Sequence, residues 1–184
     1  EKKVVAMDKE GFPFDYNAMI ASALGQPSTA FGSIYLPFDG PRQVARLPGP
    51  PYHFMSRVTK VEGELGTCAL GTTIELEYDI PQDGWYFREN GYPVMPFAVL
   101  LEAALQPCGW LASAVGSALL ENKDLYFRNL DGTGTLHREL NHLSGTLCTR
   151  VTIKNISRSG GMIIEAFDVS CFVGQQKVYT LQTV

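Results

Sequence analysis

The chain contains few of the residues that hold metals or nucleotides. Its 184 residues include three histidines and four cysteines, with no Cys-x-x-Cys pair, no His-Glu-x-x-His motif and no glycine-rich phosphate loop after a predicted strand. The cysteines are too widely separated for the paired ligands of a zinc site; they are Cys68, Cys108, Cys148 and Cys171. We therefore expect no metal and no nucleotide cofactor. We also expect buried free thiols and a reducing, cytoplasmic environment.

The chain also lacks a concentration of charge of one sign. Its formal net charge is −4, and its 15 basic and 19 acidic residues are interspersed, which argues against nucleic acid as a partner. No signal peptide is expected, because Glu1-Lys2-Lys3 is followed by only a short apolar stretch. The hydrophobic content of 45% favours one soluble domain with a sizeable core, and 18 glycines and 11 prolines indicate many turns.

One long apolar run, Val94 to Leu120, contains a single charged residue, Glu102. Pro96, Gln106 and Pro107, together with serine and glycine breaks, argue against a membrane span of that length. A helix that is apolar on all sides is also what a helix enclosed by a sheet requires. We therefore expect a buried core helix, with no membrane as partner.

The first fifty residues are expected to form a lead-in segment ahead of the main domain, residues 51–184. Asp15 can cap a short helix that runs through Leu24. Beyond it, many glycines and prolines break regular structure. The stretch at residues 31–38 is too apolar for a flexible linker, so we expect the segment to pack on the outside of the domain.

The rest of the chain has the pattern of strands around one helix. The long helix is expected near Pro96 to Leu119, with Pro96 in its first turn. Strands are expected at 54–65, 68–80, 125–130, 145–156, 162–173 and 177–184, with a loop at 81–91 and a hairpin turn at 158–161. There is no alternation of strand and helix. The order predicts an α+β fold in which an antiparallel sheet wraps around one long central helix.

Two polar residues stand out on this helix. Glu102 and Gln106 lie four residues apart and therefore share one helix face. A carboxyl group in apolar surroundings is a candidate general acid or base, and the Gln106 amide is placed to hold it by a hydrogen bond. The alternative is structural: Glu102 pairs with an arginine and closes the core.

The start of the helix is a second candidate site. The first backbone N–H groups, near Phe97 and Ala98, carry partial positive charge and would polarise a thioester carbonyl resting there. A helix that begins after a proline is common, however, so this pattern on its own is equally consistent with a purely structural start.

These residues carry a resemblance to a known family. Pro93-Val94-Met95-Pro96, followed by Glu102 and Gln106, resembles the active-site helix of the bacterial 3-hydroxydecanoyl-carrier-protein dehydratases. The wider match is similar to the dehydratase region of polyunsaturated-fatty-acid synthases and related polyketide synthases. It includes the segments 45–55, 57–59, 77–81, 95–102, 104–111, 127–132 and 159–163.

The resemblance implies a hotdog fold and the removal of water from a 3-hydroxyacyl thioester. The substrate would be carried on the phosphopantetheine of an acyl carrier protein, and a second hotdog domain, in tandem or as a homodimer, would complete the active site. It implies catalytic roles for Glu102 and Gln106, and substrate binding at Met95, Pro96 and Phe97. In the family, a histidine takes the α-proton and the acid of the facing hotdog handles the departing hydroxyl.

The sequence departs from the family pattern in two places. The family's histidine lies just before the Pro-Val-Met-Pro motif, where this chain has no histidine between Trp85 and Gly91. Phe97 stands where the family has glycine, and it would crowd the carbonyl site. We therefore expect weak or no dehydration by the isolated chain. None of the remaining histidines is favoured as a replacement base; they are His53, His137 and His142.

Three functions remain open at this point. The chain is either one catalytic half of a paired dehydratase, or a non-catalytic hotdog that supports an active neighbour and docks carrier protein, or a thioesterase of the same fold. The Pro-Val-Met-Pro motif favours the dehydratase branch.

Overall fold

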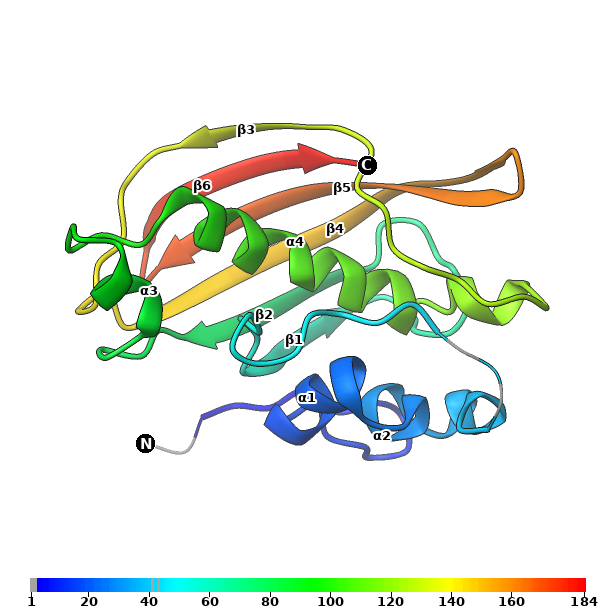
Figure 1. The fold of residues 1–184 in the computed structure, drawn as a ribbon. Helices are drawn as coiled ribbons and strands as arrows, with labels where there is room; N and C mark the ends of the chain where they lie inside the picture. Colours follow the sequence, from blue (N-terminus) through cyan, green and yellow to red (C-terminus); the bar gives the residue numbers. More distant parts are fainter. Residues whose placement is uncertain (1–2, 41, 43) are drawn as a thin grey trace.

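The computed structural model describes residues 3–40, 42 and 44–184, and its centre is one antiparallel sheet wrapped around a long helix (Figure 1). The sheet has six strands in the order β1-β2-β4-β5-β6-β3. The strands are β1 (Arg57–Glu62), β2 (Thr73–Asp79), β3 (Gly132–Leu136), β4 (Thr146–Ser159), β5 (Met162–Val173) and β6 (Gln176–Thr183). All neighbouring strands pair antiparallel. The prediction of an α+β hotdog fold is confirmed.

The central helix, α4 (Phe97–Ala114), crosses the concave face of the sheet (Figure 1). It is long and apolar enough to resemble a membrane span, but 67% of it is buried inside the fold, as in a core helix. The helix ends earlier than expected, because Gly116 adopts a left-handed conformation with φ 95°. A Cβ atom there would lie 2.9 Å from the backbone of Gly66. A short 3-10 helix, η2 (Ser117–Leu120), follows.

Strand β2 separates apolar from charged side chains by alternation. On β2, Ile74, Leu76 and Tyr78 are buried against the core, as their spacing in the sequence predicts. The other face carries ion pairs, most tightly around Arg57, whose side chain is 10% exposed. Its guanidinium group donates to Glu77 and with two nitrogens to Asp79, at 2.7 to 2.9 Å.

The lead-in segment is more regular than predicted. As well as the expected helix α1 (Tyr16–Leu24), capped by Asp15, it contains α2 (Pro27–Phe31) and the 3-10 helix η1 (Ser33–Phe38), where an irregular chain was expected. Pro27 occupies the first turn of α2, a position that suits proline. The aromatic rings of Phe14 and Phe31 pack against Trp110 of α4, with centroids 5.1 and 5.9 Å away.

The lead-in segment also covers one edge of the sheet. The N–H of Ala6 donates to the carbonyl of Val58 on β1 at 2.8 Å, and the N–H of Val58 donates to the carbonyl of Phe14 at 3.0 Å. At the opposite edge, all five residues of β3 are exposed. The two edges of the sheet therefore differ: β1 is covered and β3 is open.

Two local predictions were wrong. The expected strand at 125–130 is not a strand; this segment runs extended beside α4, and the strand β3 begins later, at Gly132. The expected loop at 81–91 contains a short helix, α3 (Trp85–Glu89), whose residue Tyr86 is buried with its hydroxyl 2.9 Å from that of Tyr78. The first two strands are also shorter than predicted, at 57–62 and 73–79.

We expect the Arg57 ion pairs to stabilise the fold at neutral pH and to lose this contribution in acid. Arg57 holds the pKa of Asp79 well below its usual value, so this stability is present above the unfolded-state pKa of about 4 and is lost as the pH falls below it. Arg57→Met should lower the free energy of unfolding at neutral pH by about 2 kcal/mol, less than a fully buried pair because Asp79 is 40% exposed. Urea denaturation at a series of pH values measures this.

The control is Arg150→Met, whose guanidinium also contacts two carboxylates but is 38% exposed, so that a smaller loss is expected. The difference between wild type and Arg57→Met should shrink below about pH 4. A difference that stays constant into acid would contradict the assignment.

Candidate active site

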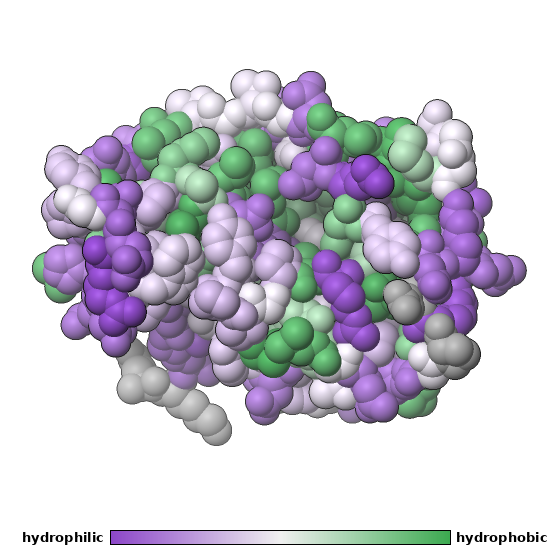
Figure 2. All heavy atoms as spheres, in the orientation of Figure 1, coloured by the Kyte–Doolittle hydropathy of each residue, from purple (hydrophilic) through white to green (hydrophobic). Residues whose placement is uncertain are grey.

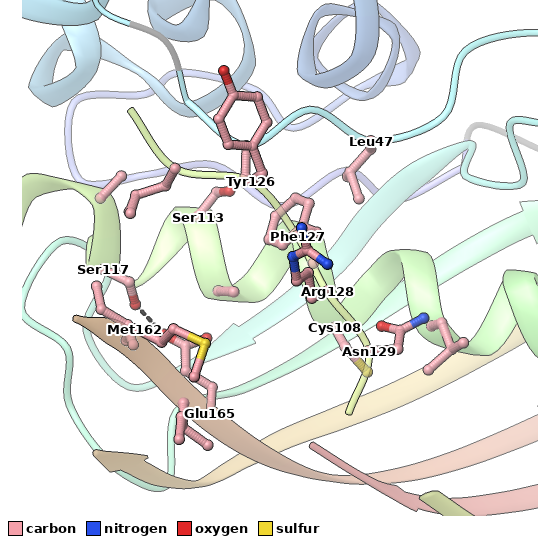
Figure 3. Close-up of a pocket in the computed structure, with 18 of the residues that line it drawn as sticks. Leu47, Cys108, Ser113, Ser117, Tyr126, Phe127, Arg128, Asn129, Met162 and Glu165 are labelled. Carbon is pink, nitrogen blue, oxygen red and sulfur yellow. Dashed lines mark hydrogen bonds between the residues drawn. The ribbon is translucent and has the colours of Figure 1, made fainter. Parts of the chain in front are cut away.

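A groove of about 610 Å³ lies along α4 (Figure 3). Its walls come from six parts of the chain. These are α4, the lead-in residues 45–48, Ser117 and Ala118 of η2, the start of β5 (161–165 and Phe167), Thr183 and Val184 at the end of β6, and residues 123–130, called here the strap. The strap is held at its ends by the Lys123 side chain, which donates to the Gly161 carbonyl, and by the N–H of Leu130, which donates to the Val184 carbonyl at 2.9 Å.

A glycine on α4 allows the walls to approach the helix. A Cβ atom at Gly109 would lie 2.7 Å from Leu47 Cδ2 and 3.4 Å from Phe127 Cζ. Both the lead-in segment and the strap therefore contact the helix backbone at this point. Leu47, Gly109 and Phe127 all line the groove at this point.

Glu102 and Gln106 both line the groove, as their spacing predicts. The Gln106 amide Nε2 donates to Glu102 Oε2 at 3.3 Å. Gln106 is 2% exposed, whereas Glu102 is half-buried. Among residues 3–40, 42 and 44–184, no arginine or lysine forms an ion pair with Glu102. The alternative in which an arginine neutralises Glu102 thus has no support in the described part of the chain.

Gln106 has a second role that the sequence did not indicate. Its Oε1 accepts the backbone N–H of Phe54 at 2.8 Å, and its Nε2 also donates to the carbonyl of Tyr52 at 2.9 Å. These bonds fix the orientation of the amide, so that an N–H faces Glu102. Gln106 therefore joins the chain that enters β1 to the carboxyl group in the groove.

Tyr52 is a residue near Glu102 that sequence reasoning missed. Burial and, as the smaller cause, the charge of Glu102 raise the pKa of the Tyr52 hydroxyl above its usual value. Its ring packs against Phe54 and Trp85, with centroids 4.9 and 6.3 Å away. Nothing in the spacing of the sequence could have paired Tyr52 with a helix residue fifty positions later.

The residues predicted to bind substrate at the helix start lie outside the groove walls. Met95 is buried, and its N–H donates to the Leu140 carbonyl at 2.7 Å; Pro96 caps the helix. Phe97 is 52% exposed, and its ring stands edge-on to that of Tyr179 on β6 at 5.8 Å. Since none of the three lines the groove, their role in substrate binding stays a prediction.

The three histidines do not line the groove either. His53 Nδ1 contacts the Pro48 carbonyl at 3.0 Å, its Nε2 is buried without a partner in the described structure, and burial lowers its pKa. His137 Nε2 lies 3.1 Å from the Thr180 hydroxyl, and His142 packs edge-on to the Phe87 ring at 6.1 Å. None is therefore positioned to act on a group next to Glu102.

The described residues gather no metal-binding group. In the ranges 3–40, 42 and 44–184, no set of three or more histidine, cysteine, aspartate or glutamate side chains could hold a metal ion. The four cysteines are free of disulfides; Cys108 and Cys171 are buried, and Cys68 and Cys148 are half-buried.

Comparison with known proteins places these features in a family. A family model described as a FabA-like domain matches residues 47–182, which is most of the chain. One of the component proteins of the polyunsaturated fatty acid synthase of a Thraustochytrium species is 28% identical over 162 residues. That match covers 87% of this chain but only 10% of the relative, so the chain spans about a tenth of the length of that protein.

Two solved structures are similar to this chain. The dehydratase heterocomplex ApeI:P from Xenorhabdus doucetiae is similar with a TM-score of 0.55 and 12% identity, over 74% of this chain and 83% of the other. The PaaI protein from the phenylacetic acid degradation operon of E. coli has a TM-score of 0.47 and 13% identity, over 67% and 79%. At 12% identity, the likeness to the dehydratase heterocomplex concerns the fold alone.

We expect Gln106 to be important for stability. Gln106→Leu leaves the buried N–H of Phe54 and the carbonyl of Tyr52 without their partner, and should lower the free energy of unfolding by about 2 kcal/mol. Urea denaturation measures this. The control is Gln175→Leu, at an exposed turn position, where little change is expected. Equal denaturation midpoints for the two variants would contradict the structural role of the amide.

Proposed function

Since the chain belongs to the FabA-like domain family and has the hotdog fold, we propose that it is one hotdog of a paired 3-hydroxyacyl-carrier-protein dehydratase. The observation that carries the proposal is the carboxyl group of Glu102. It faces a groove beside the central helix, is held by Gln106, and has no cation paired with it among the described residues.

In the proposed reaction, Glu102 acts on the departing hydroxyl. A base on the facing hotdog takes the α-proton of the 3-hydroxyacyl thioester, and the electron pair forms the double bond between the α and β carbons. The hydroxyl leaves from the β carbon with a proton from Glu102, as water. The α-proton held by the base then returns to Glu102 through solvent. The reaction needs no cofactor beyond the phosphopantetheine that carries the acyl group.

The open edge of the sheet supports pairing with a second hotdog. Strand β3 is fully exposed, and nothing in the described chain pairs with its outer side. Large apolar side chains near this edge are exposed, among them Phe97, Leu130 and Leu136 at 52%, 55% and 45%. Figure 2 shows hydrophobic residues gathered between hydrophilic ones on the face that carries α4. Pairing would cover these groups and bring a second site residue to Glu102.

The similarity to a component of a polyunsaturated fatty acid synthase suggests the kind of enzyme in which the chain acts. We propose that the chain acts within a cytoplasmic polyunsaturated-fatty-acid or polyketide synthase, on acyl groups delivered by an acyl carrier protein. Glu102 and Gln106 are then the site residues that this chain contributes, and Met95, Pro96 and Phe97 flank the entry of the thioester.

One observation favours a second function, a hotdog that supports an active neighbour without catalysis. The segment Trp85 to Gly91 has no histidine; its last helical turn instead carries Arg88, which is exposed. The chain therefore contributes an acid without the family's base. In the supporting role, Glu102 would matter for stability and leave turnover unchanged.

Glu102→Gln distinguishes the two functions, because it keeps the size of the side chain and removes its proton. In the chain paired with its partner hotdog, we expect turnover of a 3-hydroxyacyl pantetheine thioester to fall about a hundredfold or more, with the melting temperature nearly unchanged. The enoyl product is followed by its ultraviolet absorbance. Glu139→Gln, at an exposed position, is the control. Unchanged turnover together with a lower melting temperature would favour the second function, a hotdog without catalytic activity.

The isolated chain provides a separate test. Without the partner's base, we expect dehydration to be slower than in the pair by about a hundred- to ten-thousandfold. Turnover is measured for the chain alone and after addition of the partner hotdog. Robust turnover by the chain alone that is abolished by His53→Ala would show that the base has been assigned to the wrong domain.

A further inference from the structure

The end of the groove away from Glu102 contains a second inward-facing carboxyl group. On β5, the buried residues Phe167, Val169 and Cys171 alternate along the face turned to α4. Glu165 occupies the next position of this alternation, where the pattern of the strand calls for an apolar residue. Both Glu165 and its neighbour in the alternation, Ile163, line the groove.

Glu165 has one close polar partner. The hydroxyl of Ser117, at the start of η2, donates a hydrogen bond to Glu165 Oε1 (Figure 3). Burial and, as a smaller cause, the charge of Glu165 raise the pKa values of the Cys68 thiol and the Tyr35 hydroxyl, and burial raises the pKa of Glu165 itself. In the described chain, no lysine or arginine forms an ion pair with Glu165.

The two carboxyl groups lie at opposite ends of an apolar passage. Glu102 and Ser113 both line the groove from α4, and at a rise of about 1.5 Å per residue they are about 16 Å apart along the helix. Ser117 follows one turn later. Between the two ends, the residues from α4 and β5 are mostly apolar and include Leu105, Cys108, Gly109, Ala112 and Phe167. The strap adds polar residues to the same groove, among them Arg128 and Asn129.

We propose that Glu165 and Ser117 set the longest acyl chain that the groove accepts. This rests on the proposed function, in which the thioester end of the substrate lies at Glu102 and the hydrocarbon tail runs along α4. A tail that ends in the apolar passage gains from each buried methylene. A longer tail presses a methyl group against the carboxyl, which then loses water without gaining a hydrogen bond.

The test is direct binding, which does not depend on turnover. Amide analogues of 3-hydroxyacyl pantetheine thioesters, with saturated chains of increasing length, are titrated into the 184-residue chain by calorimetry. Affinity should rise about fourfold with each methylene until a limit and then fall. In Glu165→Leu, probes beyond the limit should bind about tenfold more tightly, and shorter probes should bind as to wild type. Glu165→Met provides a second apolar variant should the first fail to fold.

Two controls separate the carboxyl from other effects. Glu165→Gln keeps a polar group in place and should retain the limit, and Glu139→Leu removes an acid from an exposed position away from the groove. The role of Glu165 would be overturned if the folded apolar variants kept the same chain-length limit, or if their affinity rose equally for probes of all lengths. Binding that is absent for every probe would instead overturn the proposed function, because the groove would then hold no acyl chain.

Discussion

The structure depends on covering a helix that is apolar on all sides. The sheet buries one side of α4, and the aromatic residues of the lead-in segment bury another through Trp110. The strap crosses the remaining side at Gly109, where the absence of a side chain lets Phe127 and Leu47 approach. The groove is the space that these three covers leave open. Its position therefore follows from the core rather than from a separate binding module.

A polar side chain buried on such a helix lowers the stability of the fold unless it forms hydrogen bonds. The hydrogen-bond partners therefore explain where these residues stand. Gln106 satisfies two backbone groups at the entry to β1 as well as Glu102. Glu102 also lines the groove. In the described structure its carboxyl group accepts one side-chain hydrogen bond, from the Gln106 amide. Stability thus accounts for Gln106, whereas Glu102 is better explained by chemistry.

The sequence predicted the central helix and the shared face of Glu102 and Gln106, because these depend on periodicity within one element. The order of strands and helix predicted a sheet wrapped around that helix, and the resemblance implied the hotdog fold. The sequence misplaced a strand at 125–130, since Leu125 and Phe127 alternate as in a strand but cover α4 instead of pairing with another strand. The contacts of Gln106 with Tyr52 and Phe54, and of Ser117 with Glu165, join residues about fifty positions apart. Spacing within one sequence does not reveal such pairs.

The two edges of the sheet bear on the proposed pairing of this chain with a second hotdog that carries the base. Among the residues that the structure describes, the lead-in segment occupies the edge at β1, whereas the edge at β3 stays open to a second sheet. The acid lies on α4, half-buried and open to the groove, while the segment just before that helix has no histidine. An acid without a base is of little use in a closed single domain. It becomes useful where the open edge lets another hotdog bring its base to the same substrate.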